Sequence, residues 1–293
     1  MFLQWMSVPA RSRRRFRANG NLAERGLTPR QWYVVDMLAH GGVMTAGQLG
    51  LPPRTLRHYA RLGLVRRLDF PGDEVRAALE ALGWPADQRQ DWSLWALGPT
   101  GQALAKRRWP FAPMSGYEVW PLQRVLHDAI VVEIVRLLAG YAWEQGWEVF
   151  WAGTNAAELR RGQEEVLEPD SLMVFRRGVE VRAVCIEYHN ERGTARAREK
   201  VRRYERAFRE GDLWQAHWDL EAFPLVLAVA HDPAVFRGYL EALRERRDRP
   251  VTFYGKALSS LLQGNVATWK RIDTRQEENL FPNTESGVLV GPH

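Results

Sequence analysis

The sequence predicts an α/β chain, α+β overall, and three observations support this fold class. Three short helical patterns and a strand pattern come first, between residues 28 and 68. A Pro- and Gly-rich break follows at 109–116 and marks a domain boundary. Beyond it, strands and helices alternate after a hairpin, which is typical of a mixed sheet flanked by helices. The predicted organisation is an arm over 1–27, a winged helix-turn-helix over 28–108, a linker over 109–121, a sheet domain over 122–263 and a tail over 264–293.

The composition is that of a globular protein with room for two cores. The chain has 293 residues, of which 45% are hydrophobic and 26% are charged. Its single cysteine excludes an internal disulfide and favours a reducing compartment. No apolar run approaches the roughly 20 residues that span a bilayer, and neither a Gly-rich phosphate loop nor zinc-type Cys/His spacing occurs. We therefore expect a cytoplasmic protein without a membrane partner.

The net charge of +6 is unevenly distributed along the chain. Residues 1–110 contain 17 Lys and Arg against 8 Asp and Glu, whereas the remainder contains 24 against 27. This concentration of positive charge indicates a polyanionic partner, above all nucleic acid. The arm over 1–27 is Arg-rich and has little apolar periodicity, so we expect it to be mobile. Two explanations of its positive charge remain open: the arm is a solubilising tail, or it contacts the DNA backbone.

The N-terminal helices follow from capping and breaking residues. Thr28 is an N-cap and Pro29 a first helical residue, and Gly41-Gly42 ends this helix. Thr45 predicts a short second helix as far as Leu49. A third helix begins after Pro52 and ends at Gly63. The strands Leu64–Leu68 and Ser93–Leu97, an insertion over 71–91 and a closing helix over 102–108 complete the pattern of a winged helix-turn-helix.

The third helix carries a continuous basic stripe. Its members lie at i, i+3, i+4 and i+7, so they share one helix face. The strand that follows adds two arginines. A solvated helix face is the plain explanation, but Arg on both helix and strand favours entry of this helix into the major groove of double-stranded DNA. The predicted DNA-binding residues are Arg54, Arg57, His58, Arg61, Arg66 and Arg67.

The second half of the chain predicts a long helix over 122–143 and then a sheet. The helix places Glu133 inside its apolar stripe. A hairpin of strands 171–175 and 179–189 follows, and its alternation puts Glu187 and His189 on one face. The hairpin brings Asp170 towards Glu187, and two adjacent carboxylates suit a hard cation such as Mg²⁺. A solvated Glu at a strand end is the alternative explanation.

The residues of this hairpin resemble known families. Pro169-Asp170, the hairpin and Glu187 resemble the core of the PD-(D/E)xK nuclease superfamily. The run 187–194, with Lys200 and Tyr204 on the next helix, resembles more narrowly the replication-relaxation family of plasmid and mobile-element proteins. His189 stands where a nuclease carries Lys, and residues 190–191 are inserted before the Arg-Gly-Thr sequence.

The resemblance implies a restriction-endonuclease-like fold and a role in replication or processing of plasmid, phage or other mobile DNA. Mg²⁺ or Mn²⁺ would be held by Asp170 and Glu187 together with Glu133. Lys200, ahead of His189, would replace the missing catalytic Lys. His127, near the start of the long helix, occupies a position where this family often carries His, but it is interpreted as an ordinary helix-face histidine. The resemblance leaves two further partners open: replication or mobilisation proteins, and a second copy of the chain.

Two functions remain open from the sequence. One is a metal-dependent DNA endonuclease, which the Pro-Asp pair and Glu187 favour. The other is a non-enzymatic transcriptional regulator or replication accessory factor with a degenerate nuclease fold, which the absent Lys favours.

Overall fold

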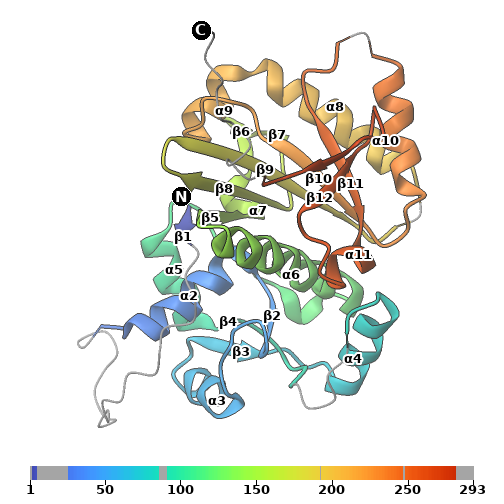
Figure 1. Ribbon diagram of the computed structural model, residues 1–293. Helices are drawn as coiled ribbons and strands as arrows, with labels where there is room; N and C mark the ends of the chain where they lie inside the picture. The colour runs from blue at the N-terminus through green and yellow to red at the C-terminus, as the bar shows by residue number, and fades with distance from the viewer. Residues whose placement is uncertain (1, 5–25, 86–90, 192, 247, 282–293) are drawn as a thin grey trace, which may run out of the picture.

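The computed structural model describes residues 2–4, 26–85, 91–191, 193–246 and 248–281, and it has a mixed α/β fold (Figure 1). Its centre is an eight-stranded sheet of order β1-β5-β8-β9-β10-β11-β12-β13. The neighbours β9, β10 and β11 run parallel and the other pairs run antiparallel. The strands are β1 (Leu3–Gln4), β5 (Glu148–Gly153), β8 (Ser171–Arg177), β9 (Glu180–His189), β10 (Leu225–Ala230), β11 (Phe253–Ala257), β12 (Thr268–Arg271) and β13 (Glu277–Asn279).

Helices cover both faces of this sheet. Alternate residues of β8 and β9 enter two different apolar clusters, as the pleat requires. The cluster on one face includes α6 (Leu122–Glu144), and the cluster on the other includes α8 (Ala195–Arg209), α9 (Gly211–Trp218) and α10 (Val235–Arg244). Short elements complete this part: α7 (Thr154–Ala157), β6 (Leu159–Arg161), β7 (Glu164–Leu167) and α11 (Leu258–Leu262).

The N-terminal part combines helices with a small sheet of order β2-β4-β3. Its first helix begins as predicted, because Thr28 and Gln31 exchange the two hydrogen bonds of a capping box. The predicted short helix after Thr45 is wrong: Thr45 ends a strand, and a turn closed by two bonds with Gln48 follows. The elements are α2 (Pro29–Gly41), β2 (Met44–Thr45), α3 (Pro53–Arg61), β3 (Val65–Arg67), α4 (Gly72–Ala81), β4 (Leu94–Leu97) and α5 (Pro99–Arg108).

The N-terminal part and the large sheet share one apolar core. Side chains of α2, α6 and β5 belong to the same buried cluster. At the junction Gly153 approaches α2 so closely that a Cβ would overlap the carbonyl oxygen of His40. The predicted linker packs into this junction: Trp109 and Phe111 contact the His40 ring, and Tyr117, in the 3₁₀ helix η1 (Tyr117–Val119), is buried.

The ends of the chain differ from the prediction. Residues 264–281 are not a loose tail, because β12 and β13 extend the sheet and Trp269, Leu280 and Phe281 are buried. At the other end, Leu3–Gln4 pairs with β5. The rest of the predicted arm as far as residue 25, and residues 282–293, lie outside the described residues. No described helix is long and apolar enough to cross a membrane.

Candidate functional site

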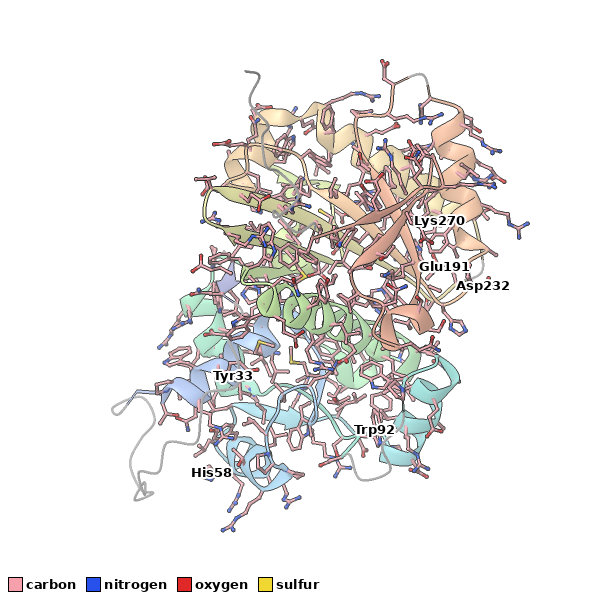
Figure 2. All side chains as sticks on the ribbon, in the orientation of Figure 1. Tyr33, His58, Trp92, Glu191, Asp232 and Lys270 are labelled. Carbon is pink, nitrogen blue, oxygen red and sulfur yellow. The ribbon has the colours of Figure 1, made fainter. Side chains whose placement is uncertain are left out.

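The candidate site lies where the parallel strands β9 and β10 end. This edge of an α/β sheet is where ligands commonly bind. Figure 2 shows Glu191 and Asp232, which follow these two strands, at the same edge. Ser171 pairs with Ile186 in the β8–β9 register, so the preceding residue Asp170 stands opposite Glu187. The hairpin therefore brings the two predicted carboxylates to one edge of the sheet.

Glu187 is enclosed by two side chains of α8. Its Oε2 lies 2.5 Å from Lys200 Nζ, and its Oε1 accepts a hydrogen bond of 2.7 Å from the Tyr204 hydroxyl. Lys200 also donates to the carbonyl oxygen of Glu168 at 3.1 Å. Burial opposes the charge of Lys200, but Glu187 and Asp170 outweigh it and raise the pKa of the ammonium. Lys200 and Tyr204 thus point the same way, as their spacing of one turn indicates.

Asp170 is held from the other face of the sheet by α6. Its Oδ2 accepts a 2.7 Å hydrogen bond from the Tyr188 amide and lies 3.5 Å from His127 Nε2. The other ring nitrogen of His127 lies 3.5 Å from Asp128, which in turn accepts a 2.6 Å bond from the Tyr117 hydroxyl. These contacts form a polar chain from the junction with the N-terminal part to the sheet edge.

Charge pairing shifts the pKa of both members of the His127–Asp170 pair. Burial would raise the pKa of Asp170, but His127, Lys200 and the Tyr188 amide lower it well below its usual value. Burial would lower the pKa of His127, yet the two flanking aspartates raise it to about 10. His127 is therefore an imidazolium at neutral pH.

Two residues predicted for the site are engaged elsewhere. The carboxylate of Glu133 pairs with Arg136 at 2.6 Å and accepts a bond from Gln48, so it belongs to the junction with the N-terminal part. His189 shares a strand face with Glu187, but its ring nitrogens contact the Tyr239 hydroxyl at 2.7 Å and Glu191 at 2.8 Å. Both ring nitrogens of His189 are therefore already engaged in contacts within the protein.

His127 and Tyr204 are the site residues that the sequence interpretation undervalued. His127, not Glu133, is the residue of α6 that reaches Asp170. One signal pointed to it: a His-Asp pair in the first turns of a helix that was expected to flank the site. Tyr204 was noted only for its place on α8, yet it closes one side of Glu187.

The carboxylates of this edge fit a metal centre poorly. Both oxygens of Glu187 are already engaged, and Asp170 Oδ2 accepts from a backbone amide. Ca²⁺ takes six to eight oxygen ligands, and Mg²⁺, which keeps several waters, still needs one or two carboxylates whose oxygens are free to bind it. In the described part of the chain no group of three or more His, Cys, Asp or Glu is placed to hold a metal ion.

A second candidate site is the outer face of α3. Leu56 and Tyr59 anchor the helix in the core, so the opposite face is turned to solvent. Figure 2 shows His58 at the end of the molecule away from the large sheet. On this face of α3 and on the strand that follows it, the exposed basic side chains that form no ion pair with any described residue are Arg54, Arg57, His58 and Arg61 of α3 and Arg67 of β3. We refer to these five as the α3 stripe.

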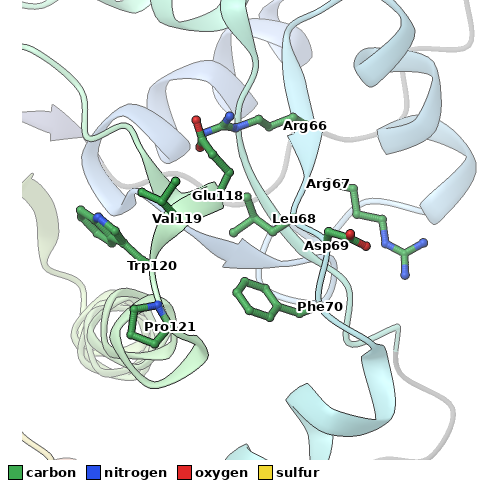
Figure 3. Close-up of a pocket in the computed structure, with 9 residues that line it drawn as sticks. All are labelled: Arg66, Arg67, Leu68, Asp69, Phe70, Glu118, Val119, Trp120 and Pro121. Atoms are coloured by element: carbon green, nitrogen blue, oxygen red, sulfur yellow. The ribbon is translucent and has the colours of Figure 1, made fainter.

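Arg66 does not belong to the α3 stripe. Its guanidinium lies 2.5 Å from Glu118, and both residues line a groove of about 570 Å³ between residues 66–70 and residues 118–121, which precede α6 (Figure 3). Arg66 therefore has an acidic partner, unlike the residues of the α3 stripe, and its contact with DNA stays a prediction. Arg67 points away from that pair.

Comparison of the chain with family models, with curated proteins and with solved structures found no match. The resemblance to the replication-relaxation and PD-(D/E)xK families therefore stays a hypothesis.

Proposed function

We propose that this protein binds double-stranded DNA through the α3 stripe. The observation that carries the proposal is the absence of acidic partners there: none of its five basic groups pairs with a described carboxylate. Cationic groups without internal partners are available to phosphates, and their binding releases condensed counterions. Base edges in the major groove are within reach of a helix that projects in this way.

The small sheet beside α3 supports the same proposal. The chain leaves α3 through Gly63, whose φ of 70° provides the tight turn, and enters β3 at once. β3 pairs with β4, and the closing helix α5 follows β4 directly. The order α3-β3-β4-α5 resembles the end of a winged helix-turn-helix, in which the helix reads the groove and the strands contact the backbone, and a turn replaces the predicted second helix.

The experiment compares two double substitutions in the full-length chain. Arg57→Ala/Arg61→Ala removes two charges from the α3 stripe, and Arg202→Ala/Arg206→Ala removes two exposed arginines from α8 as the matched control. Fluorescence anisotropy with a labelled duplex at low salt measures affinity, and circular dichroism checks folding. We expect at least a tenfold loss for the α3 variant, since each contacting Arg contributes about 1–3 kcal/mol. Equal affinities for the two variants would reject the proposal.

A metal-dependent DNA endonuclease is the second candidate. It is favoured by one observation, the meeting of Asp170, Glu187 and Lys200 at the end of the sheet. The engaged oxygens of Glu187 and the missing third acid favour instead the non-enzymatic regulator or replication accessory factor. Partners among replication or mobilisation proteins rest on the resemblance alone.

A plasmid-nicking assay separates the endonuclease from the non-enzymatic protein. Supercoiled plasmid is incubated with the protein and Mg²⁺ or Mn²⁺, and we expect no nicking. Nicking that Asp170→Ala abolishes would establish the endonuclease.

A further inference from the structure

The sheet edge holds an unusual amount of buried charge. The side chains of Glu187, Lys200 and Asp170 are 1%, 9% and 11% exposed, and that of His127 is 20% exposed. A buried charge without a partner is costly, so such groups persist only in pairs or with bound ions. Here each carboxylate has its own cation: Lys200 for Glu187 from α8, and His127 for Asp170 from α6.

The surroundings of Lys200 are those of a cation ligand shell. Its ammonium lies 2.5 Å from a carboxylate oxygen of Glu187 and 3.1 Å from the carbonyl oxygen of Glu168. The negative charge of Asp170 also acts on it. Carboxylate and carbonyl oxygens are the groups that bind Mg²⁺ and Ca²⁺ in proteins.

We infer that Lys200 is a built-in counter-cation, which occupies the position of a divalent ion between Glu187 and Glu168 and keeps this edge of the sheet free of metal. A metal ion could bind here only after the ammonium of Lys200 had moved away from Glu187. That movement would break an ion pair that is almost completely shielded from water, so it opposes metal binding. Removal of the Lys200 side chain should have the opposite effect. It leaves the Glu187 carboxylate and the Glu168 carbonyl, with the negative charge of Asp170 acting on the same position, beside a space that a hydrated Mn²⁺ can enter.

Binding of Mn²⁺ to the full-length chain, without DNA, tests this inference. Electron paramagnetic resonance measures the free ion, and calorimetry measures the heat of binding. We compare wild type, Glu187→Gln, Lys200→Ala and the double variant Lys200→Ala/Glu187→Gln. We expect no specific Mn²⁺ site in wild type, one site in Lys200→Ala, and loss of that site in the double variant.

Each other outcome overturns the inference. A wild-type Mn²⁺ site that Glu187→Gln abolishes would show that Lys200 does not exclude the ion. Absence of a site in a folded Lys200→Ala protein would show that another feature excludes it. If Lys200→Ala does not fold, Lys200→Met, which keeps the apolar stem, takes its place. The outcome is independent of the α3 stripe, because a protein that fails to bind DNA still gives a Mn²⁺ result.

Discussion

The helices α3 and α8 are both rich in arginine, yet their charges have different surroundings. The arginines of α3 face solvent without an acidic partner among the described residues. Five of the six arginines of α8 lie against acidic side chains of neighbouring elements and of α8 itself, and Arg209 forms no ion pair with a described residue. The pairs are Arg196–Glu191, Arg198–Glu241, Arg202–Glu199, Arg203–Glu165 and Arg206–Glu164. The difference teaches that availability of charge depends on the elements packed around a helix rather than on its own composition.

The cations of α8 also differ from one another in how deeply they are buried. Its outer arginines form exposed pairs, which typically contribute 0–1 kcal/mol to stability. On its inner face, Lys200 holds a carboxylate that is only 1% exposed. Removing one partner of such a buried pair leaves an uncompensated charge, which is far more costly. One helix therefore contains cations with structural effects of very different size.

The largest expected effect is that of Lys200→Ala on stability. We expect a loss of about 3–5 kcal/mol in the free energy of unfolding at pH 7, because Glu187 stays buried without its cation. Urea denaturation measures it. The control is Lys200→Met/Glu187→Gln, which removes both charges and should lose less. A loss below about 1 kcal/mol for Lys200→Ala would mean that the Lys200–Glu187 pair contributes no more to stability than the exposed ion pairs of α8.

The second prediction concerns the salt dependence of DNA binding. Each phosphate contact contributes about 0.9 to the slope of log K against log salt concentration. Arg57→Ala and Arg61→Ala should each reduce that slope by about 1 if they contact phosphate, whereas Arg202→Ala should leave it unchanged. Affinity titrations between low and physiological salt measure the slope. An unchanged slope in all three variants would remove the distinction between α3 and α8.

The third prediction concerns pH and the His127–Asp170 pair. The pKa of His127 is about 10 in the folded protein and near its usual 6.5 in the unfolded chain. Its contribution to stability is therefore complete below pH 6.5 and is lost as the pH rises towards 10, by at most about 1.4 kcal/mol per pH unit. Asp170 behaves in the opposite sense, because its lowered pKa makes its contribution fall away in acid.

Chemical denaturation between pH 6.5 and 9.5 measures this dependence. His127→Gln keeps a polar group but cannot titrate, so it should flatten the curve in that range. Asp128 and Asp170 are the charged groups that flank the ring. A curve of unchanged slope in His127→Gln would contradict the pairing.

The smallest expected effect is that of Arg206→Ala. This arginine pairs with Glu164 and Glu210 at the surface, where solvent and salt screen the attraction. We expect the smallest destabilisation among these variants, because exposed ion pairs contribute little to stability. Thermal unfolding at low and high salt measures it, and a cost approaching that of Lys200→Ala would mean that exposed and buried cations of α8 contribute equally.

Local patterns in the sequence were enough to predict most elements. The start of α2 depends on Thr28 and Gln31, which are three residues apart. The four members of the α3 stripe that lie on α3 follow from spacing along one helix, and the position of Glu187 opposite Asp170 follows from a single hairpin. In each case the interacting residues are close in the chain, so periodicity and turn chemistry determine the outcome.

Only the tertiary structure decided which charged group pairs with which. Glu133 contacts Gln48, 85 residues away, and Asp170 contacts His127, 43 residues before it. Arg66 is neutralised by Glu118, and residues 264–281 join the sheet because β11 offers them an edge. Periodicity indicates on which face of an element a side chain lies, but it does not indicate which residues of another element pack against that face. The partner of a buried charge is therefore determined by packing between segments that are distant in sequence. At this sheet edge, that packing places Lys200 of α8 against Glu187.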